Sequence, residues 1–103
     1  MQVIETQYNG YRFRSRLEAR WAVFFDAMGW KYLYEHEGFV LKNGRQYLPD
    51  FWFPDHQFWI EIKPARPSYE EFTIAYDFAI AKIPYYILGG PPGDHGCYFV
   101  DDS

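Results

Sequence analysis

Apolar residues recur with helical spacing in two stretches of the chain, residues 14–30 and 68–82. In each stretch they would share one face of a helix. Gly29 supplies a stop for the first helix, and Ser68 with Glu71 has the spacing of a capping box at the start of the second. The apolar positions are Leu17, Trp21, Phe24, Phe25 and Met28 in the first stretch, and Phe72, Tyr76, Ala79 and Ile83 in the second.

Shorter apolar or alternating runs predict strands between and after the helices. These runs are residues 30–37, 44–53, 57–64, 85–90 and 97–102. The order α-β-β-β-α-β, with one further strand at the end, is typical of α/β domains. A crossover through the second helix would let residues 85–90 lie parallel to an earlier strand. We expect a single domain over residues 1–103, with a mixed four- to five-stranded sheet flanked by two helices.

A tight turn at residues 54–57 would join the two central strands. Phe53 then faces Phe58, Asp50 faces Glu61 and Leu48 faces Lys63. This register leaves one face of the hairpin wholly apolar and puts Glu61 and Lys63 on the other. The apolar face would consist of Pro49, Phe51, Phe53, Phe58, Ile60 and Ile62.

Two facing carboxylates are destabilising and need an explanation. Asp50 and Glu61 could share a proton, with one pKa raised. Lys63 could neutralise them, as a purely structural ion cluster at a solvated strand end. They could also hold a divalent cation, since Mg²⁺ prefers oxygen ligands. The spacing alone leaves these alternatives open.

Glu18 is a third acid that could face the sheet, because it lies at the edge of the apolar stripe of the first helix. A structural role is equally consistent with the sequence. Ser15 and Glu18 match a capping box, and Arg14 could pair with Glu18 at the i, i+4 spacing.

The net charge of −4 argues against an undirected nucleic-acid binder, but the charge is unevenly distributed. Four of the ten Lys and Arg residues fall within residues 11–20, either as a basic patch or as a solvated helix start. No apolar run is long enough to cross a membrane, and the first residues lack the pattern of a secretory signal. The lone Cys97 fits a reducing cytoplasm.

Pro49-Asp50 in one strand and Glu61-Ile62-Lys63 in the next resemble the motif of the PD-(D/E)XK nuclease superfamily, whose members have a restriction-endonuclease-like fold. The flanking segments, over roughly residues 10–90, look like small phage and bacterial members. The resemblance implies a metal-dependent DNA endonuclease that hydrolyses phosphodiester bonds in the cytoplasm of a bacterial or phage-infected cell.

The resemblance also implies roles for individual residues. Asp50, Glu61 and the backbone carbonyl of Ile62 would bind Mg²⁺ or Mn²⁺. Lys63 would orient or help deprotonate the attacking water. Glu18 would act on the metal through water, or on a second metal. Such an ion polarises the phosphate and lowers the pKa of bound water.

DNA is the expected partner, and a membrane is not. Arg14 is the foremost candidate for phosphate contacts, with Arg12, Arg16 and Arg20 beside it and Lys42, Arg45 and Arg66 as secondary candidates. The second Pro-Asp pair, Pro54-Asp55, is expected to serve only the turn. A homodimer would be needed to cut both strands with one site per chain.

Two other hypotheses remain open. The first is a catalytically inactive member of the same fold, acting as a DNA-binding or protein-interaction module. The second is an aromatic-rich protein-binding domain with an incidental ion cluster.

Overall fold

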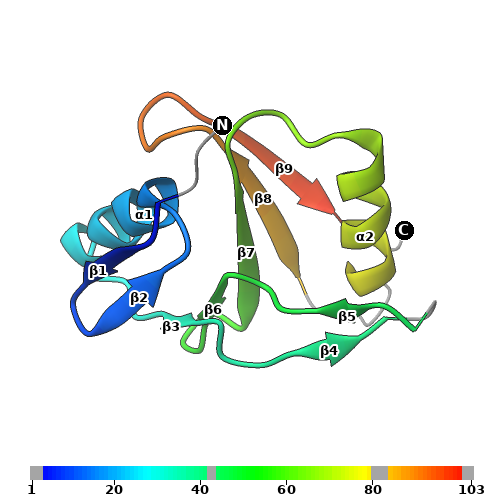
Figure 1. Cartoon of the computed structure of the whole chain (residues 1–103), viewed down its shortest axis with the longest axis horizontal. Coiled ribbons are helices and arrows are strands. Elements are labelled where there is room, and N and C mark those ends of the chain that lie inside the picture. Colours follow the sequence, from blue (N-terminus) through cyan, green and yellow to red (C-terminus); the bar gives the residue numbers. More distant parts are fainter. Residues whose placement is uncertain (1–3, 42–43, 80–83, 101–103) are drawn as a thin grey trace.

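A computed structural model describes residues 4–41, 44–79 and 84–100. Its centre is a mixed five-stranded sheet of order β3-β6-β7-β8-β9, with one helix packed on each face (Figure 1). The expected α/β class is therefore confirmed. The strands of this sheet are β3 (Leu33–Tyr34), β6 (Phe51–Phe53), β7 (Phe58–Lys63), β8 (Tyr85–Gly89) and β9 (Gly96–Val100).

The central hairpin and the crossover have the predicted geometry. β6 and β7 are antiparallel, with Phe53 opposite Phe58 and Trp52 opposite Trp59. The chain then crosses through the second helix, and β8 returns parallel to β7. The ladder between β6 and β7 begins at Phe51, so the predicted pairing of Leu48 with Lys63 is not part of it.

Helix α1 (Arg16–Ala27) begins where the capping box predicts. The Ser15 hydroxyl accepts a hydrogen bond from the Glu18 amide at 3.1 Å. After the helix, Gly29 has φ +75°, a conformation that suits glycine at a helix end. Met28 was expected on the buried face but is 52% exposed, because it lies past the last helical residue.

Helix α2 (Tyr69–Ala79) has a complete capping box. The Ser68 amide donates to Glu71 Oε1 at 2.8 Å, and the Glu71 amide donates to Ser68 Oγ at 3.1 Å. The face turned to the sheet passes through the buried Ala75 and Phe78. The prediction that Tyr76 lies on this face is wrong, because Tyr76 is 50% exposed. The side chains of Ala79 and Ile83 lie outside those described.

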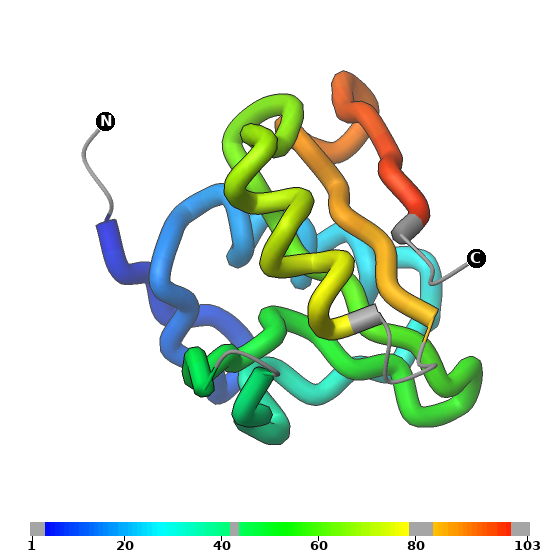
Figure 2. Tube along the Cα trace, turned by 90° about the vertical axis from the view of Figure 1, so that its right-hand side faces the viewer, coloured from blue at the N-terminus to red at the C-terminus, as the bar shows by residue number. Residues whose placement is uncertain are grey.

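Side chains of β7 alternate between two hydrophobic clusters. Ile60 and Ile62 pack with Phe51 and Phe53 beneath α1. Trp59 packs on the opposite face with residues of β8 and α2, including Phe78. Figure 2 shows α2 running across the sheet on this second face. The two helices therefore cover opposite faces, as the alternation along the strand requires.

Two hairpins outside the central sheet were not predicted. β1 (Thr6–Tyr8) and β2 (Tyr11–Phe13) are joined by Asn9 and Gly10, both with positive φ, and lie beside α1 (Figure 1). β4 (Phe39–Val40) and β5 (Gln46–Tyr47) form the second hairpin.

Two predicted strands were too long. The strand expected over residues 30–37 is limited to β3, because the chain turns at Glu35, whose φ is +48°. The strand expected over residues 44–53 is divided into β5 and β6. Pro49, which cannot donate to a ladder, lies in the break. Within the described part of the chain, no helix is both long and apolar enough to cross a membrane.

Candidate functional site

Asp50 and Glu61 come together where the ladder between β6 and β7 ends. Asp50 Oδ2 accepts a hydrogen bond from the Ile62 amide at 2.8 Å, and the Asp50 amide donates to Glu61 Oε1 at 3.1 Å. Each carboxylate therefore bonds to the main chain of the opposite strand. Both side chains come from residues that are only 7% exposed. The β6–β7 ladder ends at Phe51 and Ile60, so the predicted pairing of Asp50 with Glu61 lies just beyond it, but the two residues are in contact through these hydrogen bonds.

Burial of both acids makes their negative charges unfavourable. Burial raises the pKa of Asp50 well above its usual value, and the nearby carboxylates of Glu61 and Glu18 raise it further. Burial also raises the pKa of Glu61, although Lys63 and the bonds with Asp50 oppose the change. The pair would therefore gain from a cation that reduces the repulsion between the two charges.

Lys63 connects this pair to α2. Its Nζ lies 3.5 Å from Glu61 Oε2 and 3.3 Å from Glu71 Oε2. Burial alone would lower the pKa of Lys63, but the charges of Glu61 and Glu71 outweigh that effect and raise it. Lys63 is therefore a charged ammonium group that pairs with the carboxylates of Glu61 and Glu71.

The backbone around Lys63 is tightly packed. The Gly90 amide donates to the Lys63 carbonyl at 2.9 Å, and Gly89 pairs with Lys63 across the β7–β8 ladder. A Cβ at Gly89 would lie 2.5 Å from the carbonyl oxygen of Ala65. Glycine at this position lets the chain after Lys63 pass close to β8.

A second polar group links the start of α1 to Asp50. Tyr34, on β3, hydrogen-bonds Glu18 through its hydroxyl, which also accepts from the Arg14 amide at 3.1 Å. The Glu35 amide donates to the Asp50 carbonyl at 2.8 Å. Burial, together with the hydrogen bond to Glu18, raises the pKa of Tyr34. Tyr34 therefore holds Glu18 in place as a neutral hydroxyl.

Arg14 pairs with a different acid from the one expected. Its Nε lies 2.7 Å from Glu35 Oε2, and no described contact joins it to Glu18. The difference arises because α1 starts only at Arg16, so Arg14 precedes the helix and lacks the i, i+4 geometry. Burial raises the pKa of Glu35, and the charge of Arg14 opposes this increase.

Glu61, Lys63 and Glu71 open into a cavity of about 330 Å³ between β5, α2 and the sheet. We call it the carboxylate pocket. Arg14 and Arg45 also line it, as does Tyr47, whose hydroxyl is hydrogen-bonded to that of Tyr85. Solvent and ions can therefore reach Glu61 and Lys63 in spite of their burial.

The donor set is consistent with Mg²⁺ or Mn²⁺. No group of three or more His, Cys, Asp or Glu in the described segments is arranged to hold a metal ion. Mg²⁺ commonly takes only one or two carboxylates, with water and phosphate oxygens completing its shell. Asp50 and Glu61 could supply that number, with the Ile62 carbonyl as the further ligand expected from the resemblance.

The structure separates the four predicted arginines. Arg14 lines the carboxylate pocket, and the secondary candidate Arg45 joins it there. Arg12 lies on β2, 3.9 Å from Glu5, in a depression of the β1–β2 hairpin. Arg16 and Arg20 are exposed on α1 and line neither of these two pockets. Asp55 is exposed in the turn, as expected for a structural residue.

Sequence reasoning missed Tyr34 and the second role of Glu71. Glu71 was recognised only as part of a capping box, and its contact with Lys63 depends on how α2 lies on the sheet. Tyr34 carries no sequence signal, since its role depends on the approach of β3 to the start of α1.

The chain was compared with protein-family models, curated proteins and solved structures, and none of them matches it.

Proposed function

We propose that this protein is a metal-dependent DNA endonuclease with a restriction-endonuclease-like core. One observation carries the proposal: two buried carboxylates, Asp50 just before β6 and Glu61 on β7, meet beside Lys63, and Glu61 and Lys63 line an open pocket. A buried pair of acids is costly for a purely structural protein. Binding of a divalent cation would offset that cost.

Each group has a defined task in this proposal. Asp50 and Glu61 would hold the ion, which would polarise the phosphate and lower the pKa of a bound water. Lys63 donates hydrogen bonds from its ammonium group to the attacking water and to the phosphate oxygens. Glu18, held by Tyr34, orients a water near the carboxylate pair. Arg14 contacts the phosphate backbone from the side of the pocket.

Cleavage of supercoiled plasmid with Mg²⁺ or Mn²⁺ tests the proposal. The wild type should nick or linearise the plasmid, and Asp50→Asn and Lys63→Ala should abolish this activity. Asp55→Asn is the matched control, because it makes the same change at the exposed Pro-Asp pair. The nuclease is refuted if plasmid and a duplex with a single-stranded flap both stay intact with either metal, or if Asp50→Asn cleaves as well as the wild type.

The second candidate is a catalytically inactive protein of the same fold that binds DNA or another protein. One observation favours it: Lys63 already lies within ion-pair distance of Glu61 and Glu71, so these acids have a cation beside them without a bound metal. It predicts DNA or protein binding that does not depend on divalent metal and survives Asp50→Asn. DNA binding in the presence of a chelator, without cleavage when metal is added, would support this candidate.

A further inference from the structure

We propose that a second pocket, formed by the β4–β5 hairpin, receives the base of an unpaired nucleotide. This makes DNA with a single-stranded segment the substrate class. The inference rests on the proposed function, because it places the rest of the DNA at the carboxylate pocket. We call the second cavity the hairpin pocket.

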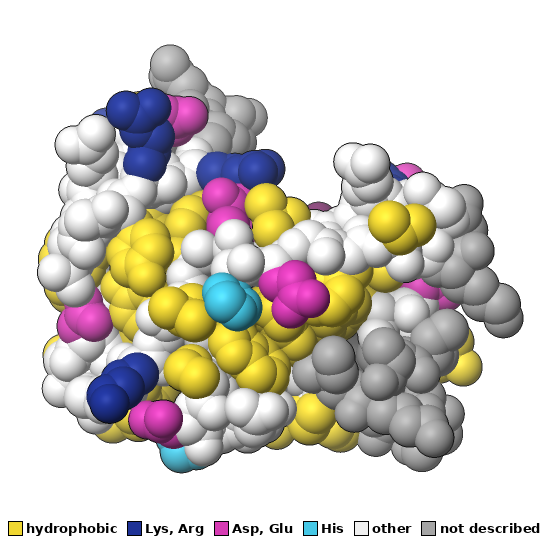
Figure 3. Space-filling view, turned by 90° about the horizontal axis from the view of Figure 1, so that it is seen from below, with side chains coloured by type: hydrophobic (Ala, Val, Ile, Leu, Met, Phe, Trp, Pro, Cys, Tyr) yellow, Lys and Arg dark blue, Asp and Glu magenta, His cyan; other side chains and the backbone are white. Residues whose placement is uncertain are grey.

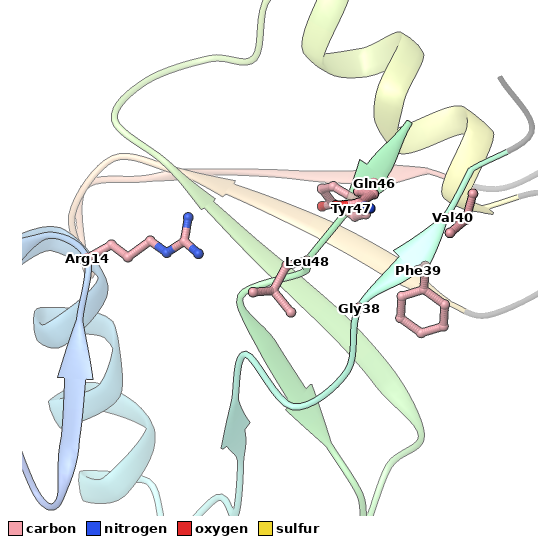
Figure 4. A pocket seen from close by; sticks show the side chains of 7 residues that line it. All are labelled: Arg14, Gly38, Phe39, Val40, Gln46, Tyr47 and Leu48. Atoms are coloured by element: carbon pink, nitrogen blue, oxygen red, sulfur yellow. The ribbon is translucent and has the colours of Figure 1, made fainter. Parts of the chain in front are cut away.

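The hairpin pocket has the size and lining of a small-ligand site. Its volume is about 510 Å³, within the range of known ligand pockets. Phe39, Val40 and Leu48 supply apolar walls, while Gln46 supplies an amide and Arg14 a guanidinium (Figure 4). A nucleobase requires this combination of flat apolar contact and polar groups at its edge.

The hairpin pocket adjoins the carboxylate pocket. Arg14, Gln46 and Leu48 line both cavities. In Figure 4, Arg14 extends from the segment before α1 toward Leu48. A chain with one nucleotide in the hairpin pocket would therefore have its neighbouring phosphate near Arg14 and Lys63.

The charge of the hairpin pocket favours an anionic chain. Arg14 is the charged residue among the described side chains that line it. Two more cations, Arg45 and Lys63, line the adjoining carboxylate pocket together with the acids Glu61 and Glu71. Neutralisation of phosphates by such groups supplies most of the sequence-independent affinity for nucleic acids.

The walls of the hairpin pocket are fixed by the core. The Phe39 ring packs edge-on against the rings of Trp59 and Phe78, with distances of 5.4 and 4.9 Å between the ring centroids. Tyr47, at the junction of the two pockets, is hydrogen-bonded to Tyr85. Figure 3, a view from below relative to Figure 1, shows hydrophobic side chains around the centre of that face, with a histidine and an acidic side chain among them. A preformed wall reduces the entropy lost on binding.

The base must be unpaired to enter this pocket. In a duplex each base is stacked and paired, so its flat face is not available to a protein cavity. Single-stranded segments present that face freely, and one stacked base typically contributes enough for at least about a fivefold gain in affinity. The proposed nuclease would therefore act on DNA with a flap, an overhang or a gap.

Fluorescence anisotropy of two labelled DNA probes tests the inference. A chelator in the buffer removes divalent metal, so binding is measured without cleavage. Both probes are a short duplex with a single-stranded extension. In one the extension carries bases, and in the other it is abasic, which keeps the phosphates. The wild type should bind the base-bearing probe at least about fivefold more tightly.

Val40→Glu and Val23→Glu form a matched pair of variants. Val40 is 74% exposed at the hairpin pocket, and Val23 is 47% exposed on α1, away from it. Val40→Glu should bring the ratio of the two affinities close to one, whereas Val23→Glu should leave it unchanged. Thermal unfolding checks that both variants fold.

The inference would be overturned if the wild type bound the two probes equally or bound neither of them. It would also be overturned if Val40→Glu and Val23→Glu lost the preference for the base-bearing probe to the same extent. The plasmid test separates it from the proposed function. Cleavage of plasmid without a preference for the base-bearing probe refutes the hairpin pocket alone. A preference for the base-bearing probe, with no cleavage of either plasmid or flap DNA when metal is added, refutes the nuclease and leaves the hairpin pocket as a binding site.

Discussion

The two faces of β7 differ in what they contain, although they alternate along the same six residues. Beneath α1, Ile60 and Ile62 join a dry cluster of aromatic rings. Beneath α2, Trp59 is followed on the same face by Glu61 and Lys63, which line an open pocket. Period-two alternation therefore lets one strand serve the core on one face and carry charged groups on the other.

The difference suggests a division of labour between stability and function. The aromatic face should contribute most of the free energy of folding. The charged face should reduce that free energy in the absence of metal, because Asp50 and Glu61 are buried acids with raised pKa values. Four variants test this division, from the largest expected effect to the smallest.

Phe51→Ala should have the largest effect on stability. The Phe51 ring is fully buried. Its centroid lies 5.2 Å from that of the Phe25 ring and 5.4 Å from that of the Tyr34 ring. Truncation would leave a cavity and lower the free energy of unfolding by about 3–5 kcal/mol. Urea unfolding followed by circular dichroism measures this change. A loss below about 1 kcal/mol would show that the face beneath α1 is not the main source of stability.

Asp50→Asn should have the opposite sign. Asparagine keeps an oxygen that can accept from the Ile62 amide but removes the buried charge. Without metal, the free energy of unfolding at neutral pH should rise, because the substitution removes a buried charge and its repulsion with Glu61. The exposed Asp55→Asn should change it little. A destabilised Asp50→Asn protein would contradict the cost assigned to the charged face.

The pH dependence of stability gives a second measure of the same cost. The pKa of Asp50 is higher in the folded chain, so its protonated form stabilises the fold. That contribution is complete below the unfolded pKa of about 4 and is lost as pH rises through the folded pKa. The stability advantage of Asp50→Asn should therefore grow from pH 4 upward. An advantage independent of pH would mean that charge is not its cause.

Tyr34→Phe should have an intermediate effect on stability and should also weaken metal binding. It removes the hydroxyl that holds Glu18 and accepts from the Arg14 amide. We expect a loss of about 1 kcal/mol in stability and up to about tenfold weaker Mn²⁺ binding, as for other groups that orient ligands. Calorimetry measures the affinity. Unchanged Mn²⁺ binding would remove Glu18 from the metal site.

Glu71→Gln should have the smallest effect on stability. Its ion pair with Lys63 is partly exposed, and such pairs contribute less than about 1 kcal/mol. The variant nevertheless frees Lys63 from one of its two acids, so the rate of plasmid cleavage should change more than the melting temperature. If the melting temperature changes and the rate does not, Lys63 has only a structural role.

The central part of the fold could be predicted because its signals are local. The turn at residues 54–57 sets the register of β6 and β7, and the alternation that follows assigns Ile62 and Glu61 to opposite faces. The β1–β2 hairpin could also have been predicted. Asn9-Gly10 between short apolar runs is the usual signature of a two-residue turn with positive φ.

The rest depends on contacts between distant segments. The partner of Arg14 is decided by the turn at Glu35, which no local pattern indicates. The second contact of Lys63 depends on the position of α2 over the sheet. The hairpin pocket requires Arg14 and the β4–β5 hairpin to approach each other in space. The charged residues of the candidate site could therefore be predicted from the sequence, whereas their interaction partners could be identified only from the structure.

We propose above that the charged face of β7 holds a divalent cation. Calorimetric titration of the wild type with Mn²⁺ tests it most directly, with Asp50→Asn and Glu61→Gln beside Asp55→Asn. We expect saturable Mn²⁺ binding to the wild type and to Asp55→Asn, and its loss in the other two variants. The absence of binding to the wild type, or equal binding to Asp50→Asn, would contradict it.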